Sequence, residues 1–341
     1  MPILKPLQAL QQGQWIKLIC GASYQDLPLI RNLSLVYSLA GVHCIDGAAD
    51  LAVIGSIRVG VEAAQTWLSQ NDLTPQPRPW LMVSLNDGED PHFRKAIFEP
   101  QLCPPQCPRP CESVCPPQAI ATEGINAEKC YGCGRCLPLC PWGLITTESH
   151  IVAPQTVLPW LETGLVDALE IHTQVGHEQE FQRLWSKLAQ GMASLKLLSI
   201  SCPYQPGVLA YLQAIANIIA PLNCPLMWQT DGRPMSGDIG KGTTHTAIKF
   251  AQLLLGAKMR GFIQLAGGTN IHTRSKLAQL GLLATPTTMP TAPFINGIAY
   301  GSYARNLLQE LLADPNPLEQ DPPRLQAAIA AVAPLCNPCF C

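Results

Sequence analysis

The chain has 341 residues, of which 47% are apolar and only 13% are charged, so it is long enough to bury one large core. Its 22 Lys and Arg residues nearly balance 24 Asp and Glu residues, and the net charge of −2 predicts no nucleic-acid partner and no attraction to an anionic membrane. The N-terminal segment lacks the basic and apolar pattern of a secretory signal, and no apolar run approaches the roughly 20 residues of a membrane span, so we expect a cytoplasmic protein without a transmembrane segment.

Residues 1–99 alternate short apolar runs with longer amphipathic segments, a pattern typical of repeated β/α units. The predicted strands are Trp15–Cys20, Val42–Ile45 and Trp80–Leu85. The predicted helices are Asp26–Ala40 and Ile57–Gln70. We interpret this stretch as the first part of an α/β barrel.

A cysteine-rich segment follows, in which eight of the 15 cysteines lie within residues 103–140. In a chain without an export signal, such crowding indicates metal binding rather than disulfides. The second four cysteines precede Pro141 and form the C-x2-C-x2-C-x3-C-P run of bacterial ferredoxins: Cys130, Cys133, Cys136 and Cys140. We therefore predict a ferredoxin-like insertion over residues 100–149 that holds two [4Fe–4S] clusters.

The first four cysteines have the wider spacing C-x3-C-x3-C-x3-C before Pro116: Cys103, Cys107, Cys111 and Cys115. Because two gaps are one residue longer than usual, the iron content here is open, and a [3Fe–4S] cluster is an alternative. In two-cluster ferredoxins the last Cys of each run ligates the other cluster, which assigns Cys115 to the second run and Cys140 to the first. A pair of zinc sites is the other interpretation, but zinc does not require two interleaved runs that each end in Cys-Pro.

Residues 150–313 resume the alternation and complete the barrel. The predicted strands are Ala168–His172, Leu195–Ser201, Leu226–Gln229, Gly261–Leu265 and Gly297–Tyr300. The predicted helices are Gln155–Glu162, Glu178–Gln190, Gly207–Ile219, Thr244–Leu255, Arg274–Leu280 and Tyr303–Leu312. Eight strands favour a closed (β/α)8 barrel, and a doubly wound open sheet is the alternative. The gap after the third strand is longer than the others by about 50 residues, which places the cysteine-rich insertion in the third βα loop, on the face where barrel sites are built.

Polar and glycine residues follow several strands on that face. Loops after strands seven and eight often bind phosphate in barrels, and glycines let backbone N–H groups approach an anion. We predict a site for a phosphate compound, a quinone or another small molecule from six residues: Asp231, Lys241, Gly267, Gly268, Thr269 and Asn270. The alternative is that these glycines and threonines only serve tight connections. We predict no catalytic residue, and we interpret His172 and His245 as structural.

Residues 314–341 form a predicted Pro-rich linker and a cysteine-containing tail. The tail carries Cys336, Cys339 and Cys341, which could bind metal or exchange thiols, and their role stays open. Four isolated cysteines are expected to be small core residues: Cys20, Cys44, Cys202 and Cys224.

Four segments taken together, CPPQCPRPCESVCP, CYGCGRCLPLCPWGLI, WQTDGRPMSGDIGKGTTH and QLAGGTN, resemble the cyanobacterial light-dependent-period protein family. The resemblance covers most of the chain. It implies an iron–sulfur protein associated with redox-sensitive input of light information to the circadian clock, with clock or redox proteins as partners.

Two functions are compatible with these observations. The first is a regulatory redox sensor or electron-transfer protein, in which the cysteine-rich insertion responds and the barrel is a docking platform. The second is an iron–sulfur oxidoreductase that uses a phosphate-containing ligand or cofactor at the barrel mouth. We favour the first, and therefore a regulatory protein rather than an enzyme.

Overall fold

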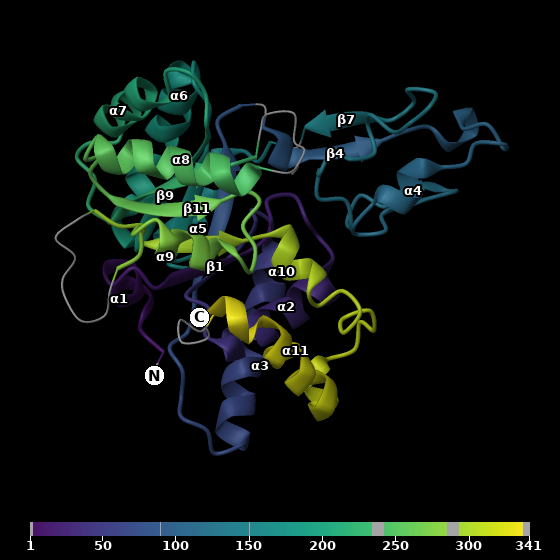
Figure 1. The fold of residues 1–341 in the computed structure, drawn as a ribbon, viewed down its shortest axis with the longest axis horizontal. Helices are drawn as coiled ribbons and strands as arrows, with labels where there is room; N and C mark the ends of the chain where they lie inside the picture. The colour runs from purple at the N-terminus through teal and green to yellow at the C-terminus, as the bar shows by residue number, and fades with distance from the viewer. Residues whose placement is uncertain (1–2, 89, 150, 234–241, 285–292, 337–341) are drawn as a thin grey trace.

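In the computed structural model, eight parallel strands close into a barrel in the order β1-β12-β11-β10-β9-β8-β3-β2 (Figure 1). The structure describes residues 3–88, 90–149, 151–233, 242–284 and 293–336. The barrel strands are β1 Trp15–Gly21, β2 Cys44–Ala48, β3 Trp80–Asn86, β8 Ala168–His172, β9 Leu197–Pro203, β10 Leu226–Asp231, β11 Phe262–Ala266 and β12 Gly297–Tyr300. Because β1 pairs in parallel with both β2 and β12, the predicted closed barrel is confirmed and the open sheet is wrong.

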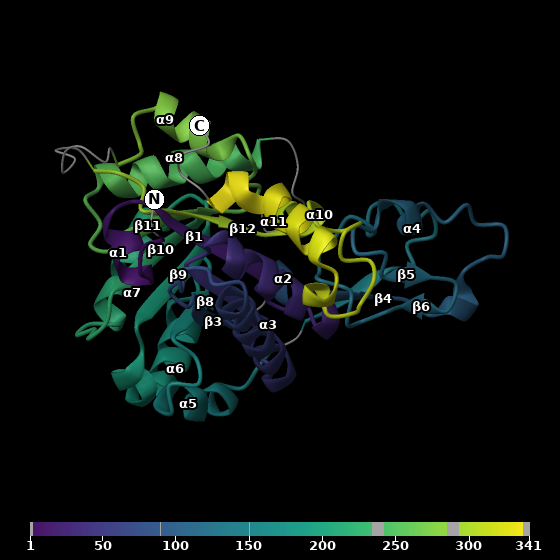
Figure 2. The same ribbon diagram turned by 90° about the horizontal axis from the view of Figure 1, so that it is seen from below.

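Helices between the strands cover the outside of the barrel (Figures 1 and 2). They are α2 Leu27–Ala40, α3 Leu51–Gln70, α5 Pro154–Glu162, α6 Glu178–Leu188, α7 Val208–Ile218, α8 Thr243–Gly256, α9 Thr273–Gln279 and α10 Ser302–Asn306, and α11 Pro322–Cys336 packs on α2. Short 3-10 turns are η1 Pro91–Phe93, η2 Pro100–Leu102, η3 Ala189–Ser194 and η4 Leu318–Gln320. None of the helices in the described ranges is both long and apolar enough to cross a bilayer.

Two helices differ from their predicted bounds by more than two residues. Helix α3 begins at Leu51 rather than Ile57, because the Asp50 side chain caps it there. Helix α10 ends at Asn306, and the following residues continue in tighter turns in which Leu308 N–H donates to the carbonyl of Arg305.

The barrel interior is layered. The first inward-facing layer is apolar, and α1 (Pro6–Gln11) covers it with Ala9 and Leu10 at the N-terminal end of the strands. Two residues further along the strands the interior becomes polar, and all members of this layer are buried: Lys17, Asp46, Ser84, Glu170, Ser199, Gln229 and Gln264. This composition departs from the branched apolar residues that usually fill such barrels.

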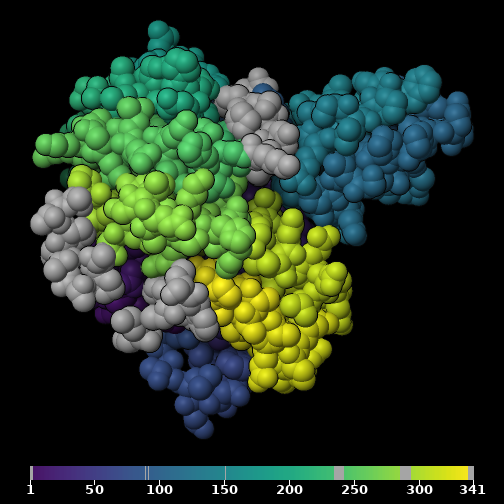
Figure 3. All heavy atoms as spheres, viewed as in Figure 1, coloured from purple at the N-terminus to yellow at the C-terminus, as the bar shows by residue number. Residues whose placement is uncertain are grey.

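Between β3 and α5 the chain leaves the barrel and forms an insertion that projects as an arm (Figures 2 and 3). Its stem is the antiparallel pair β4 (Arg94–Ile97) and β7 (Thr146–Ser149). Further out lie helix α4 (Pro110–Val114) and the hairpin of β5 (Ile120–Ala121) and β6 (Gly124–Ile125). The insertion therefore occupies the third βα connection, as predicted.

Candidate cluster sites and the barrel mouth

Four cysteines from both runs line one small cavity of about 20 Å³ in the insertion: Cys115, Cys130, Cys133 and Cys136. Apolar side chains, including those of Ala96 and Ile120, form the rest of its wall. A set of four thiols inside an apolar shell fits an iron–sulfur cluster, whose ligands are thiolates and whose surroundings exclude water. The grouping brings the last cysteine of the first run to the first three cysteines of the second.

Of the remaining four cysteines of the two runs, Cys111 is buried, and three are partly exposed: Cys103, Cys107 and Cys140. Desolvation and then the nearby Cys107 thiol raise the pKa of Cys103, and Cys140 adds to this effect. Desolvation also raises the pKa of Cys111, and Cys140 contributes there as well. These electrostatic contacts associate Cys140 with the first run.

The two Cys-Pro ends have the same local structure. The N–H of Ala119 donates to Sγ of Cys115 at 3.3 Å, and the N–H of Leu144 donates to Sγ of Cys140 at the same distance. Desolvation opposes ionisation of Cys140, but several backbone N–H groups, that of Leu144 first among them, outweigh it and lower the pKa of this thiol. Such N–H contacts are among the features that set the potential of an iron–sulfur cluster.

At the C-terminal face of the barrel lies a second cavity, of about 80 Å³. Four of the predicted site residues line it: Asp231, Gly267, Gly268 and Thr269. Asn270 does not line it and instead accepts a hydrogen bond from the N–H of His272 in its own loop. Lys241, like Cys339 and Cys341, lies outside the described residues. The four isolated cysteines and Cys336 are packed in or against the core.

The two predicted glycines at this mouth, Gly267 and Gly268, each have a packing reason to be glycine. A Cβ at Gly267 would lie 2.0 Å from Oδ1 of Asp231, and a Cβ at Gly268 would lie 1.9 Å from Oγ1 of Thr243. Both also adopt positive φ angles, which other residues rarely adopt. The close fit of the loop therefore requires glycine at both positions, whether or not a ligand binds.

The insertion contributes directly to this mouth. Tyr131 and Cys133 line the barrel cavity, and Cys133 also lines the four-cysteine cavity. Arg233, which follows β10, donates from Nη2 to the carbonyl of Gly132 at 2.6 Å. Cys133 thus stands on a wall that the two cavities share.

Below the mouth, an ion-paired group occupies the polar layer. Nζ of Lys17 lies 2.6 Å from Oε2 of Glu170 and 3.5 Å from Oδ2 of Asp46. Burial lowers the pKa of Lys17, but Glu170 and Asp46 outweigh it and the net shift is upward. Burial raises the pKa of Asp46 to about 6 in spite of Lys17. Gln229 donates to Oε1 of Glu170 at 2.7 Å, so both carboxylate oxygens have partners.

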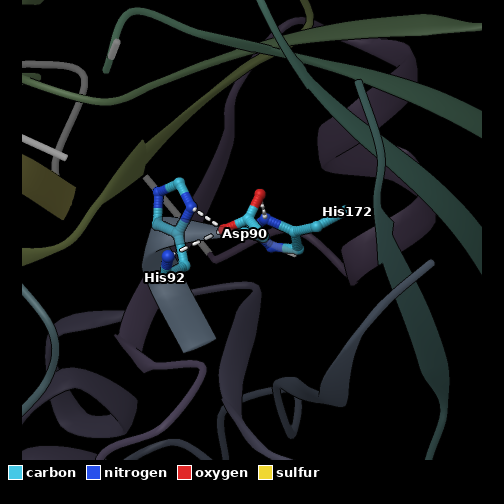
Figure 4. Close-up of side chains that lie close together, drawn as sticks. All are labelled: Asp90, His92 and His172. Carbon is cyan, nitrogen blue, oxygen red and sulfur yellow. Dashed lines mark hydrogen bonds and ion pairs between the residues drawn. The ribbon is translucent and has the colours of Figure 1, made fainter. Parts of the chain in front are cut away.

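Above this layer, two imidazoles flank one carboxylate (Figure 4). Nδ1 of His92 lies 2.6 Å from Oδ1 of Asp90, and Nδ1 of His172 lies 3.7 Å from Oδ2 of the same residue. Burial alone would lower the pKa of His172, but hydrogen bonds to Asp90 and Glu170 raise it to about 10. The pKa of His92 is also raised, because Asp90 and Asp231 outweigh its burial.

The ionisable groups form one connected chain from the barrel interior to the insertion. Nε2 of His172 lies 3.1 Å from Oε1 of Glu170, and Nε2 of His92 lies 3.2 Å from Oδ2 of Asp231. The N–H of Arg233 donates to the other oxygen of Asp231 at 2.7 Å. Asp90 and His92 escaped prediction because they lie in a connection that carries no motif. Arg233 was not predicted either, although it lies in one of the segments that carry the family resemblance. Lys17 and Glu170 are recognisable in the sequence, because each places a charged residue inside an apolar strand.

These features define a class: a closed parallel (β/α)8 barrel whose third βα loop carries a cysteine-rich metal-binding arm. Residues 103–151 match the model of the LdpA Fe-S cluster-binding domain, and residues 160–338 match that of the Light dependent period A C-terminal domain. The chain is 51% identical over 337 residues, or 98% of its length and 93% of the relative's, to Light dependent period A of Synechococcus elongatus. The chain belongs to the Light dependent period A family, and it therefore contains an iron–sulfur cluster-binding domain.

Two solved structures resemble the chain over nearly its whole length. A tryptophan synthase structure from M. tuberculosis is 11% identical, with a TM-score of 0.40 and 98% of each chain covered. A mutant tryptophan synthase alpha-subunit from Pyrococcus furiosus is 12% identical, with a TM-score of 0.40 and 95% and 98% of the two chains covered. The strand pairing of this chain establishes the barrel without them.

Proposed function

We propose that this protein is an iron–sulfur redox sensor and electron-transfer regulator that links the cellular redox state, as set by light, to circadian period. Membership of the Light dependent period A family supports the circadian part of the proposal. Its partners are then clock or redox proteins in the cytoplasm. The functional units are the barrel halves 1–99 and 150–313, the cluster insertion 100–149 and the tail 314–341.

The cofactors are two [4Fe–4S] clusters, one held by each group of four cysteines. The inner cluster is bound by Cys115, Cys130, Cys133 and Cys136, which line one cavity. The outer cluster is bound by Cys107, Cys111 and Cys140, with Cys103 as the fourth ligand. Without Cys103 the outer site would hold a [3Fe–4S] cluster.

One observation carries the sensing mechanism: Cys133 lies between the inner cluster site and the barrel mouth. A cluster held in part by Cys133 would gain a negative charge on reduction, and Arg233 is a cation bonded to the loop between Cys130 and Cys133. A change of charge at this point acts on the ion-paired chain inside the barrel, and thereby on the surface around its mouth.

An iron–sulfur oxidoreductase is the second candidate, and the cavity itself favours it. Arg233 and Arg305 line this space together with Asp231, Gly267 and Gly268, so an anionic or phosphate-bearing ligand would meet both cations close to Cys133. Flavin absorbance or a co-purifying phosphate compound would favour the enzyme. Clusters without an organic ligand would favour the sensor.

The cofactor proposal is tested by anaerobic purification with iron and acid-labile sulfide analysis, followed by EPR during a redox titration. We expect about eight irons per chain and reversible signals from two clusters. Stoichiometric zinc without sulfide would contradict the proposal.

Replacing Cys133 by Ser tests the inner site and the sensing mechanism together. We expect about half of the iron to be lost, because one of two clusters loses a ligand, and the response of partner association to a quinone oxidant to weaken. The matched control is Cys224→Ser, which removes a partly buried thiol outside the insertion and should leave both readouts unchanged. An unaltered response in Cys133→Ser would contradict the sensing mechanism even if the cluster is lost.

A further inference from the structure

Among the described residues, Asp90, His92 and His172 form a group whose potential ligand atoms all lie within 4.8 Å of one another. His172 ends strand β8, and the other two residues follow β3 at the root of the insertion. We propose that these three side chains bind one divalent transition-metal ion that is separate from the iron–sulfur clusters and faces the barrel cavity.

The geometry of the first ligand shell fits such an ion. Ligand atoms around a four- or six-coordinate ion at ~2.1 Å lie about 3.0 to 3.4 Å apart. Oδ1 of Asp90 lies 2.6 Å from Nδ1 of His92 and Oδ2 of Asp90 lies 3.7 Å from Nδ1 of His172, which brackets this range, and all three residues offer ligand atoms within 4.8 Å of one another. Small side-chain rotations therefore suffice to bring the three groups onto one ion.

The groups behind the imidazoles provide the second, independent observation. Each histidine directs Nδ1 toward Asp90 and Nε2 toward a different buried carboxylate, Asp231 for His92 and Glu170 for His172. Metal-binding histidines characteristically donate their second ring N–H to a carboxylate, which fixes the ring and strengthens the ligand. Both histidines of this site have that arrangement.

Charge balance permits the exchange of protons for a metal. Along the connected chain, four carboxylates face the two permanent cations Lys17 and Arg233, which leaves two negative charges for the imidazoles to balance. Two protonated imidazoles balance them, and so does one divalent ion that replaces the protons on the two Nδ1 atoms. The carboxylates of the chain are Asp46, Asp90, Glu170 and Asp231.

The donor set defines the class of metal. Two imidazole nitrogens and one carboxylate suit Zn²⁺ or Fe²⁺, whereas Mg²⁺ and Ca²⁺ require oxygen ligands and clusters require thiolates. His92 and His172 both line the cavity of about 80 Å³, so the proposed ion lies beside a space that could admit an exogenous ligand. The site thus has the composition of a centre that binds or activates an exogenous ligand.

The test is equilibrium dialysis of the anaerobically purified holoprotein against micromolar Zn²⁺, with zinc and iron counted per chain. We expect one zinc to bind while the cluster iron is unchanged. X-ray absorption at the zinc edge then identifies the ligands, since nitrogen and oxygen lie at about 2.0–2.1 Å and sulfur at about 2.3 Å. Absence of bound zinc, or zinc with sulfur neighbours, would overturn the proposal.

Variants assign the site to these residues. Asp90→Asn and His172→Gln each remove a ligand and should weaken zinc binding at least tenfold, and Asp231→Asn should weaken it by about 10- to 100-fold through His92. His245→Gln, an exposed histidine on α8, is the control and should not alter binding. The X-ray absorption spectrum of the zinc-loaded wild-type holoprotein identifies the ligand atoms even if a variant does not fold. Equal zinc binding by the wild type and Asp90→Asn would exclude this site.

Discussion

At the scale of single residues, the barrel is defined by ionised groups held where water is absent. Lys17 is 0% exposed and is compatible with the interior only because Glu170 and Asp46 surround its ammonium group. Removing one partner of a buried pair leaves an uncompensated charge, which typically costs about 3–5 kcal/mol. The polar layer is therefore an interdependent unit, and the chain of groups above it extends this unit to the insertion.

His43 should make the free energy of unfolding depend on pH. It is 6% exposed, and its Nδ1 accepts the N–H of Ile16 at 3.1 Å, so the folded protein holds it neutral and burial lowers its pKa to about 4. The unfolded chain protonates this residue below its ordinary pKa of about 6.5, so its contribution to stability is complete above that pH and is lost as pH falls toward 4. We expect a loss of about 3 kcal/mol at most, measured by urea unfolding from pH 7 to pH 4.

The control for this prediction is His43→Gln, which has no titrating group at the position. Its free energy of unfolding should fall less steeply over the same interval. Parallel pH profiles for the two proteins would show that His43 does not contribute.

At the scale of elements, helix α3 illustrates how a cap decides where a helix begins. Oδ1 of Asp50 accepts the N–H of Ala52 at 2.7 Å and that of Val53 at 3.3 Å, which satisfies two of the free donors of the first turn. The other oxygen accepts from Gln25 at 3.1 Å and ties the cap to the loop after β1. The predicted start at Ile57 left out Leu51–Ser56, the segment that begins at the Asp50 cap.

Replacing Asp50 by Ala should lower the free energy of unfolding by about 1 kcal/mol, the usual cost of a lost N-cap. Chemical denaturation measures this change. Asp50→Asn keeps an oxygen acceptor at the same position and should lose only a fraction of that amount. Equal losses in the two variants would mean that the charge, and not the cap, provides the stabilisation.

At the scale of the whole molecule, Arg305 helps to hold the insertion against the barrel. Its guanidinium lies 4.3 Å from the ring centroid of Tyr131, beside the cysteines of the second run. The same group donates to the carbonyls of Ile19 and Cys20 at 2.8 Å each, where β1 ends. One side chain thus joins α10, β1 and the insertion at the point where the two cavities meet.

Arg305→Gln should lower the free energy of local opening at this junction by about 1–2 kcal/mol, because it removes a buried cation–π contact and charged hydrogen bonds. Hydrogen exchange should accelerate around Tyr131 and remain slow in β8 and β9 on the other side of the barrel. Arg183→Gln, which alters an exposed arginine on α6, is the control. Uniform acceleration over the whole chain would indicate a loss of global stability instead of a local loosening.

The sequence by itself determined the barrel, the position of the insertion and the family. Strand periodicity and the Cys-Pro runs are local patterns, since they depend on the spacing between near neighbours in the chain. The sequence also indicated that Asp231, Gly267, Gly268 and Thr269 lie at the mouth, because all barrel strands present their C-terminal ends to one face.

Only the tertiary structure decided which charges meet. Asp90 and His92 follow β3 and His172 ends β8, so the insertion separates them in the chain, and barrel closure brings their ligand atoms together. The position of Cys133 on the walls of both cavities likewise depends on how the insertion packs against the barrel mouth. Contacts of this kind depend on distances across the fold, which no spacing along the chain encodes.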